Sequence, residues 1–310
     1  MTSPTSDINS DLFSEFGSAV EHDYPLARHT WFRVGGNAQF FACPTSVEQL
    51  QSIAKRAADA NLPVHVLGLG ANVLISSAGV PGVVVKLSEE AFRTIEIDRD
   101  SDRDGDRALV KVGAGADLQK LLLRTCREGL TGIECMAGIP GTVGGGVRMN
   151  AGGKFGDFGA SVLDVTVMDD EGNVFSRTRD DLVFDYRQVN IAARYILSAT
   201  LELAEDDPDA CTKRTKEIWM YKKNTQPLNT KSAGCMFKNP RGLSAGSLID
   251  RAGLKGLRVG QAEVSDKHAN FVVAHPGCTS EDIENLVSEI RSTVLEKHGV
   301  TLESEVKRWP

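Results

Sequence analysis

The sequence predicts an α+β protein of several domains, in which two α/β units precede a C-terminal α+β unit. At 310 residues, the chain exceeds the usual size of one compact core. Amphipathic helical patterns alternate with short apolar runs, as expected for α/β units. The 30 glycines and only 6% aromatic residues indicate many tight turns and close backbone approaches.

We expect four segments along the chain. An N-terminal extension covers residues 1–27, two α/β units cover 28–88 and 89–206, and a C-terminal domain covers 207–310. The last boundary depends on Glu205–Asp209, which contains four acids and one proline and is typical of a linker.

Composition excludes several classes of function. Lys and Arg total 35 against 42 for Asp and Glu, a net charge of -7, and no long basic run could follow a phosphate backbone. We therefore expect no nucleic-acid partner. The polar start, Met1–Asp11, resembles neither a secretory signal nor a membrane anchor, which favours a cytoplasmic location. The six cysteines occur singly, which indicates reduced thiols and no disulfide frame or metal site.

Local signals predict individual elements. In the first unit, a capping box of Thr45 and Glu48 predicts the start of a helix, and strands are expected at 64–67 and 82–87. In the second unit, strands are expected at 95–97, 108–112, 163–168 and 196–203, with a helix at 117–128 that ends at Gly129. The C-terminal domain is expected to contain helices at 212–223, at 245–252 before Gly253, and from the Thr279–Asp282 capping box to Gly299.

The run from Asp98 to Arg107 contains charges of alternating sign between two expected strands. It predicts a solvated hairpin tip and not a binding patch.

The first glycine loop, Gly68–Leu74, joins two expected strands. Its glycines can adopt positive φ and expose successive backbone N–H groups, so a diphosphate would fit there. The loop lacks the third glycine of a dinucleotide fingerprint, and a plain turn is the alternative.

A second glycine cluster, Gly138–Gly146, continues directly into Val147–Gly153. So many glycines among apolar residues indicate backbone packed flat against something, such as a planar ring. The alternative is a glycine-rich crossover between domains.

Taken together with His29–Gly36, these glycine segments resemble the FAD-binding region of the UDP-N-acetylenolpyruvoylglucosamine reductase family. That family has a vanillyl-alcohol-oxidase-like (PCMH-type) flavin fold. The C-terminal third is similar to the family's substrate domain, in the form without an extra tyrosine-bearing loop. The motifs there are Ser232–Pro240, Leu248–Gly256 and Lys267–Phe271, and the resemblance spans roughly residues 28–308.

The resemblance implies FAD as cofactor and NADPH as reductant. No histidine that could tether the flavin lies within Gly68–Leu74, so we expect non-covalent FAD. Two positions depart from the family: Ala71 replaces a serine and Gly146 replaces an alanine. The expected cofactor contacts are Gly68, Gly70, Ala71, Asn72, Val73, Leu74, Ile139, Gly141, Thr142, Gly145 and Val147.

The implied reaction is the reduction of the enolpyruvyl ether of UDP-N-acetylglucosamine, a step of peptidoglycan precursor synthesis. Such a site needs a cation, a proton donor and a polarising acid. Cys235 matches the family's proton-donor position, although a lone cysteine is otherwise most often a small buried hydrophobe.

Arg187 matches the family's catalytic arginine and would hold the substrate carboxylate. The alternative is a surface ion pair with Asp185 or Asp181. The family's serine two residues later is Val189 here and the following segment looks shortened, so Arg194 remains a competitor.

Glu303 and Glu305 would share one face of a strand, so spacing cannot choose the acid between them. The family's ending selects Glu305. Gln226, Lys238 and Asn239 are expected to contact the UDP diphosphate and sugar, although polar loop residues often simply cap turns.

Two rival functions are a flavin oxidase of the same fold acting on another small molecule and a non-catalytic nucleotide-sugar-binding protein. The substrate-domain motifs disfavour the first, and the presence of donor, cation and acid together disfavours the second. Nothing in the sequence indicates the oligomeric state or a choice of NADPH over NADH.

Overall fold

The computed structural model describes residues 10–99 and 106–310, which divide into two compact units. The first unit comprises the chain up to His22, Phe40–Gly68 and Pro81–Tyr221, and the second comprises Asp23–Gln39, Leu69–Val80 and Lys222–Pro310. The predicted segment 28–88 is therefore shared between the units. The division of the chain into four functional segments stays a prediction.

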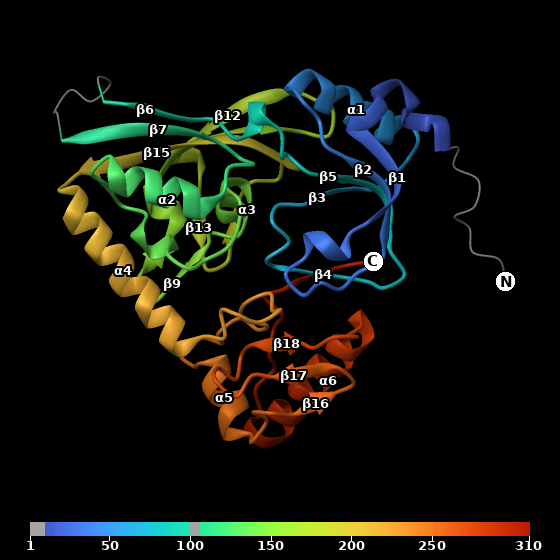
Figure 1. Cartoon of the computed structure of the whole chain (residues 1–310), viewed down its shortest axis with the longest axis vertical. Helices are drawn as coiled ribbons and strands as arrows, with labels where there is room; N and C mark the ends of the chain where they lie inside the picture. The colour runs from blue at the N-terminus through green and yellow to red at the C-terminus, as the bar shows by residue number, and fades with distance from the viewer. Residues whose placement is uncertain (1–9, 100–105) are drawn as a thin grey trace. The chain divides into compact units, whose positions relative to one another are not determined.

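A six-stranded antiparallel sheet organises the first unit, with order β12-β11-β15-β7-β6 and β8 paired to β15 (Figure 1). Its strands are β6 Ile95–Asp98, β7 Arg107–Gly113, β8 Leu130–Thr131, β11 Val162–Met168, β12 Val174–Thr178 and β15 Tyr195–Glu205. Ala108, Val110 and Val112 of β7 are completely buried, whereas the residues between them are more exposed. This two-residue period gives the sheet one apolar face.

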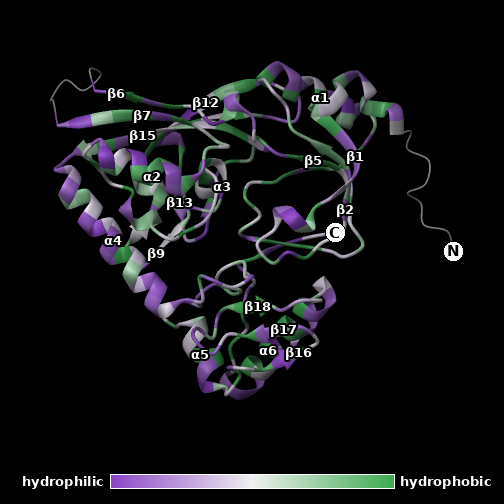
Figure 2. Ribbon diagram, in the orientation of Figure 1, coloured by the Kyte–Doolittle hydropathy of each residue, from purple (hydrophilic) through white to green (hydrophobic). Residues whose placement is uncertain are grey.

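Helices pack against that sheet. Helix α2 Leu118–Arg127 packs on β8, and α3 Val143–Arg148 packs on β7 and β15. Helix α4 Pro208–Thr225 follows β15 in the chain. The boundary between the units falls within α4. In Figure 2, green apolar stretches alternate with purple and white ones along the strands of this sheet, whereas α4 is mostly purple.

A separate four-stranded sheet has the order β1-β2-β5-β3. Its strands are β1 Val20–Pro25, β2 Asn37–Ala42, β3 Val64–Val66 and β5 Val80–Val85, and α1 Val47–Asp59 lies between β2 and β3 in the chain. Helix α1 buries Leu50, Ile53, Ala54 and Ala57 on one face.

The second unit contains a three-stranded antiparallel sheet and two helices. The sheet has the order β16-β17-β18, formed by Arg258–Val259, Ala262–Val264 and Val272–Ala274. The helices are α5 Ala245–Arg251 and α6 Ser280–His298, which pack on each other. In addition, β4 Val73–Ile75 pairs in parallel with the C-terminal strand β19 Lys307–Trp309.

Short elements complete the described chain. The 3₁₀ helices, labelled η, are η1 Ser10–Ala19, η2 Ala27–His29, η3 Glu90–Phe92, η4 Glu134–Met136, η5 Phe158–Ser161 and η6 Arg179–Asp181. The short strands are β9 Gly152–Gly153, β10 Gly156–Asp157, β13 Phe184–Asp185 and β14 Gln188–Val189.

The predicted ends of α2, α5 and α6 agree with the structure to within one residue. Helix α4 begins at Pro208, before the predicted start at Thr212, so the expected linker Glu205–Asp209 runs partly into this helix. The Thr279–Asp282 capping box is present, and Gly299 caps α6 in the left-handed conformation at φ 65°. Helix α1, however, is capped by Ser46, whose side chain accepts from the Gln49 N–H, so the predicted Thr45–Glu48 box is wrong by one residue. The predicted hairpin tip at 98–107 lies largely outside the described residues.

Among the residues that the structure describes, no helix combines the length and apolar character needed to cross a membrane.

Candidate active site

The first glycine loop requires glycine at its centre. Gly70 has φ 63°, and a Cβ placed there would lie 2.0 Å from the His29 carbonyl oxygen. Its own carbonyl accepts a hydrogen bond of 3.0 Å from the Trp31 N–H. The predicted motif His29–Gly36 therefore packs directly against this loop, and any side chain at position 70 would separate them.

The N–H groups of this loop are available for an anion. From Gly68 to Asn72, no backbone N–H donates to another group in the described part of the chain. Consecutive unsatisfied N–H groups are costly unless a ligand or water accepts from them, and they suit a phosphate oxygen. The loop thus fits the predicted diphosphate.

The second half of the second glycine cluster forms the start of helix α3, Val143–Arg148. Thr142 caps α3, its Oγ1 accepting from the Gly145 N–H at 3.3 Å. A Cβ on Gly144 would lie 3.0 Å from the Ala114 side chain, and one on Gly146 would lie 3.2 Å from Leu118. These two glycines permit close packing inside the protein, and the expected contact of the cluster with a planar ring stays a prediction.

The two glycine segments meet in the first unit. A Cβ on Gly68 would lie 2.8 Å from the Thr142 Oγ1. The backbone N–H groups of Gly141 and Thr142 likewise donate to no group among the residues that the structure describes, 10–99 and 106–310. Of the other expected cofactor contacts, Ile139 is half-buried and Val147 is completely buried in the core.

Arg187 occupies the turn of the hairpin formed by β13 and β14. Its φ of 59° is uncommon for a residue with a side chain. Its guanidinium donates to the carbonyl oxygens of Gly152 at 2.9 Å and Asn150 at 3.5 Å. Asn150 in turn donates to the Asp185 carbonyl at 3.0 Å. The hairpin and the end of the glycine cluster therefore hold each other.

The competitor Arg194 is occupied elsewhere. Its Nε and Nη2 bind both oxygens of Asp170 at 2.6 and 2.9 Å, and its Nη1 donates to the Val64 carbonyl at 2.9 Å. The hydrogen bonds to Asp170 raise the pKa of Arg194. Arg194 is thus held by a carboxylate, whereas Arg187 is held by main-chain carbonyls, and the choice of Arg187 as the catalytic cation stays a prediction.

Cys235 and Glu305 are brought together in the second unit by backbone pairing. The Glu305 N–H donates to the Met236 carbonyl at 2.9 Å, and isolated β-bridges join Phe237 to Ser304 and Cys235 to Phe271. Both Cys235 and Glu305 are half-buried. The structure thus places the predicted donor and acid on adjacent, paired segments.

The first glycine loop is hydrogen-bonded to the segment that contains Glu305. The Asn72 Nδ2 donates to the Glu305 carbonyl at 3.2 Å, and the Asn72 carbonyl accepts from the Lys307 N–H at 3.1 Å. The first glycine loop, Glu305 and the segment of Cys235 consequently belong to one hydrogen-bonded arrangement.

The two glutamates are not in a strand, contrary to expectation, and their environments distinguish them. The Glu303 side chain is 75% exposed and pairs with Lys238 at 3.4 Å, whereas Glu305 is half-buried. An exposed ion pair of this kind contributes little, about 0–1 kcal/mol, so Lys238 can exchange it for a ligand.

The other expected substrate contacts lie in the second unit. Gln226 directly follows α4 and is half-buried. The Asn239 Oδ1 accepts from the Ala245 N–H at 3.0 Å, where α5 begins. Their roles stay predictions.

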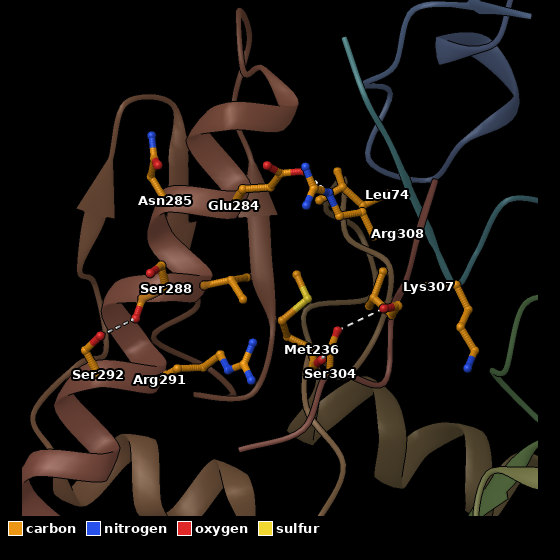
Figure 3. A pocket seen from close by; sticks show the side chains of 12 residues that line it. Leu74, Met236, Glu284, Asn285, Ser288, Arg291, Ser292, Ser304, Lys307 and Arg308 are labelled. Atoms are coloured by element: carbon orange, nitrogen blue, oxygen red, sulfur yellow. Dashed lines mark hydrogen bonds and ion pairs between the residues drawn. The ribbon is translucent and has the colours of Figure 1, made fainter. Parts of the chain in front are cut away.

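A groove of about 740 Å³ lies between α6 and the segment 304–308 (Figure 3). Met236, Ser304 and Val306 line it, each next to Cys235 or Glu305 in sequence. Cys235 and Glu305 do not line it, so the groove adjoins the neighbours of the donor and acid.

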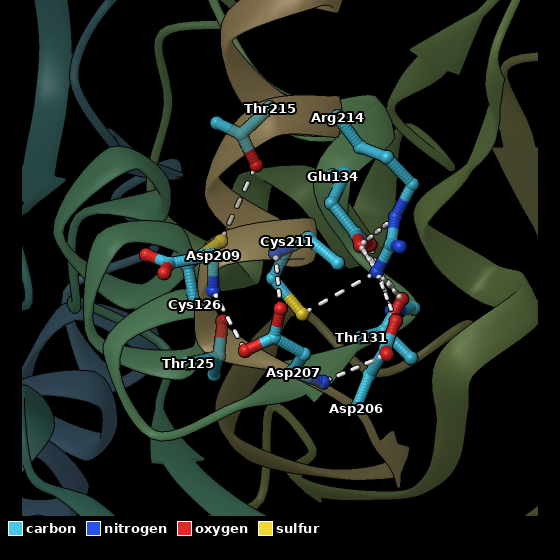
Figure 4. A network of polar contacts seen from close by, with 12 residues as sticks. Thr125, Cys126, Thr131, Glu134, Asp206, Asp207, Asp209, Cys211, Arg214 and Thr215 are labelled. Atoms are coloured by element: carbon cyan, nitrogen blue, oxygen red, sulfur yellow. Dashed lines mark hydrogen bonds and ion pairs between the residues drawn. The ribbon is translucent and has the colours of Figure 1, made fainter.

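Sequence reasoning missed a polar network in the first unit. Glu134 is buried and accepts from Thr131, from the Gly132 N–H and from Arg214, which also pairs with Asp206 (Figure 4). Burial alone would raise the pKa of Glu134, but these hydrogen bonds outweigh it and hold the pKa below its ordinary value. The network fixes α4 and has the character of a structural anchor.

Sequence reasoning also missed Asn150 and Asn270, both almost completely buried. Neither carries charge or reactivity, so only their position inside glycine-rich or family-like motifs could have drawn attention to them.

Comparisons with known proteins agree with this geometry. The model of the UDP-N-acetylenolpyruvoylglucosamine reductase C-terminal domain matches residues 226–309, and that of an FAD binding domain matches 38–177. A UDP-N-acetylenolpyruvoylglucosamine reductase of Lachnoclostridium phytofermentans is 38% identical over 287 residues, covering 91% of this chain and 90% of the relative. The chain belongs to the UDP-N-acetylenolpyruvoylglucosamine reductase family.

Further members of the family support the assignment. The reductase of Paramagnetospirillum magneticum is 38% identical over 304 residues, covering 96% of this chain and 94% of the relative. The crystal structure of the reductase from Thermus caldophilus superimposes with a TM-score of 0.79 at 36% identity, covering 94% of this chain and 99% of that one. The predicted fold class, a PCMH-type flavin-binding region with a C-terminal α+β domain, is confirmed.

Proposed function

We propose that the protein reduces UDP-N-acetylglucosamine enolpyruvate to UDP-N-acetylmuramate with NADPH, through non-covalent FAD, in peptidoglycan precursor synthesis. The observation that carries the proposal is the hydrogen-bonded series from the glycine loop through Glu305 to the segment of Cys235. It joins an anion-binding loop, an acid and a proton donor, as this reaction requires. Such precursors and NADPH are cytoplasmic, which is where we place the reaction.

The residues present fit FAD. The unsatisfied N–H groups of Gly68–Asn72 and of Gly141 and Thr142 would hold its diphosphate. When bound, FAD supplies the hydride that the enolpyruvyl group accepts, having taken it from NADPH. The protein supplies the remaining groups.

Each catalytic residue has a separate task. The Cys235 thiol donates a proton to the carbon next to the carboxylate. The Arg187 guanidinium holds that carboxylate while negative charge develops on it, and the Glu305 carboxyl group polarises the same end of the substrate. Lys238, Asn239 and Gln226 bind the UDP and sugar groups, with Lys238 released from Glu303.

The visible spectrum tests the proposal directly. Purified protein should be yellow, release intact FAD on denaturation, bleach with NADPH in the absence of oxygen, and recolour when the enolpyruvyl nucleotide is added. UDP-N-acetylglucosamine without the enolpyruvyl group is the control and should not restore the colour.

Other outcomes would favour the rival functions. Rapid oxygen consumption with an alcohol substrate and no response to the enolpyruvyl nucleotide would indicate an oxidase. A colourless protein that binds the UDP-sugar tightly and never acquires flavin would indicate a binding protein.

A further inference from the structure

One buried asparagine holds the segment that carries Cys235. Asn270 lies between β17 and β18 and is 3% exposed. Its Oδ1 accepts from the Phe237 N–H at 3.0 Å, and its Nδ2 donates to the Phe237 carbonyl at 2.8 Å. Its main-chain carbonyl also accepts from the Met236 N–H at 2.8 Å. Two consecutive residues after Cys235 are therefore bonded to a single residue.

The amide side chain acts here as a peptide group would. Cys235 and Phe271 form only an isolated β-bridge, so no regular strand continues beside Phe237. A side-chain amide presents a donor and an acceptor together and can satisfy both main-chain groups of one residue. An aspartate would offer only acceptors, and an alanine would leave both groups of buried Phe237 unpaired.

The same contacts extend to Glu305. Met236 is bonded on both sides, its N–H to the Asn270 carbonyl and its carbonyl to the Glu305 N–H. A displacement of Met236 would therefore move Cys235 and Glu305 together.

Core packing and the clamp act on different parts of the segment. The Met236 and Phe237 side chains are almost completely buried in the apolar core of the second unit, and a groove lined by Met236, Ser304 and Val306 adjoins the segment on the α6 side (Figure 3). The core holds these side chains, whereas the Asn270 hydrogen bonds fix the main chain that carries Cys235.

We propose that Asn270 is a positioning residue of the substrate-reducing step. By clamping Met236 and Phe237, it holds the Cys235 thiol and the Glu305 carboxyl group where the substrate meets them. The proposal rests on the proposed function. A displacement of the reacting groups by about 1 Å can slow such a step by about 100-fold.

The test uses two variants and a matched control. Asn270→Ala removes the whole clamp, and Asn270→Asp keeps the acceptor but removes the donor. Val264→Ala, in the same sheet, opens a cavity at a completely buried residue whose main-chain bonds go to Leu257 and Gly256. The two half-reactions, bleaching by NADPH and recolouring by substrate, are followed separately by rapid mixing.

We expect substrate-driven recolouring to slow by about 100-fold in Asn270→Ala and about tenfold in Asn270→Asp. Bleaching by NADPH should stay within about twofold of the wild type in both, because it needs no proton from Cys235. The control should change neither rate beyond about twofold.

A second readout does not depend on catalysis. In flavin-free and flavin-loaded protein, alkylation of Cys235 by iodoacetamide and hydrogen exchange of the peptide containing residues 232–238 should quicken about tenfold in Asn270→Ala and not in Val264→Ala. Unchanged exchange and alkylation would overturn the clamp even if the wild type proved inactive. Folded, flavin-loaded Asn270 variants that recolour at the wild-type rate would overturn its role in positioning. If Asn270→Ala does not fold, Asn270→Asp decides both points.

Discussion

Arg187 and the pair formed by Cys235 and Glu305 lie in different units and are anchored by different atoms. Arg187 is anchored by its own side chain, which donates to the carbonyls of Gly152 and Asn150 from a strained turn. Cys235 and Glu305 are anchored by the main chain of their neighbours and by Asn270. In the first region, the side chain proposed to meet the substrate also anchors the local fold. In the second region, the proposed reacting side chains and the groups that anchor their segments belong to different residues.

This difference decides which substitutions are informative. Replacing Arg187 changes the local structure as well as the charge, so its effect combines two losses. Replacing the Cys235 side chain leaves the pairing of Met236 and Phe237 intact, so its effect reports chemistry alone.

The largest expected effect is at Arg187. Arg187→Ala should reduce the rate of substrate-driven recolouring by about 1000-fold, because the developing negative charge loses its partner. Arg194→Ala should stay within about threefold, since its ion pair with Asp170 is partly exposed and worth about 0–1 kcal/mol. Rapid mixing with substrate measures both, and equal defects would show that the catalytic arginine is assigned wrongly.

The two glutamates give the next contrast. Glu305→Gln should slow substrate reduction by about 100-fold, because a polarising acid is lost. Glu303→Gln should leave the rate unchanged and shift KM by at most about threefold, because Glu303 is exposed and pairs only with Lys238 in this region. Steady-state kinetics of both variants decide the point; a slower turnover in Glu303→Gln would reverse the assignment.

Outside both regions, the network at Glu134 should affect stability and not chemistry. Arg214→Met should lower the free energy of unfolding by roughly 2 kcal/mol, because buried Glu134 loses a charged partner that is itself partly exposed. Denaturant unfolding measures this change. Both half-reactions should keep their rates. A selective loss of substrate reduction would show that this network contributes to catalysis and not only to stability.

The same network predicts a pH dependence. The pKa of Glu134 lies below its ordinary value, so its ionised form stabilises the fold above the unfolded pKa of about 4.3. That stabilisation is lost as pH falls through the lower, folded value. Unfolding of Glu134→Gln, followed across this acid range, should therefore show a smaller loss of stability than the wild type.

The smallest expected effect is on stability at Arg187. Arg187→Gly should change the free energy of unfolding by no more than about 1 kcal/mol, because relief of strain at φ 59° offsets the loss of the guanidinium hydrogen bonds to Gly152 and Asn150. Substrate reduction should be lost in the same variant. Thermal unfolding with and without FAD measures the change; a large loss of stability would show that the guanidinium bonds outweigh the strain.

The parts of the fold that local chemistry determines could be predicted from the sequence. The ends of α6 follow from Thr279 and Gly299, which act through their nearest neighbours. The Thr45–Glu48 box does not form because the Gln49 side chain accepts from the Thr45 N–H in place of Glu48, and Ser46 accepts from the Gln49 N–H, a choice that spacing cannot make. Helix α3 was hidden because glycine disfavours helices by about 1 kcal/mol per residue, and packing against Ala114 and Leu118 overrides that preference.

The site could be predicted only as separate residues. Family-like motifs singled out Arg187, Cys235 and Glu305, but not the pairing that joins Met236 to Glu305 and Asn270. Those contacts connect residues far apart in sequence. A neutral buried asparagine gives no signal of charge or periodicity.

The central claim is that the Cys235 thiol donates the proton in substrate reduction and takes no part in flavin reduction. Single-turnover rapid mixing of Cys235→Ala tests it most directly, with Cys235→Ser as the matched variant that keeps a donor. The account predicts bleaching by NADPH at close to the wild-type rate in both, and recolouring by the enolpyruvyl nucleotide slowed by about 100-fold or more in the alanine variant only. Recolouring of Cys235→Ala at the wild-type rate would contradict it and return Cys235 to a structural residue.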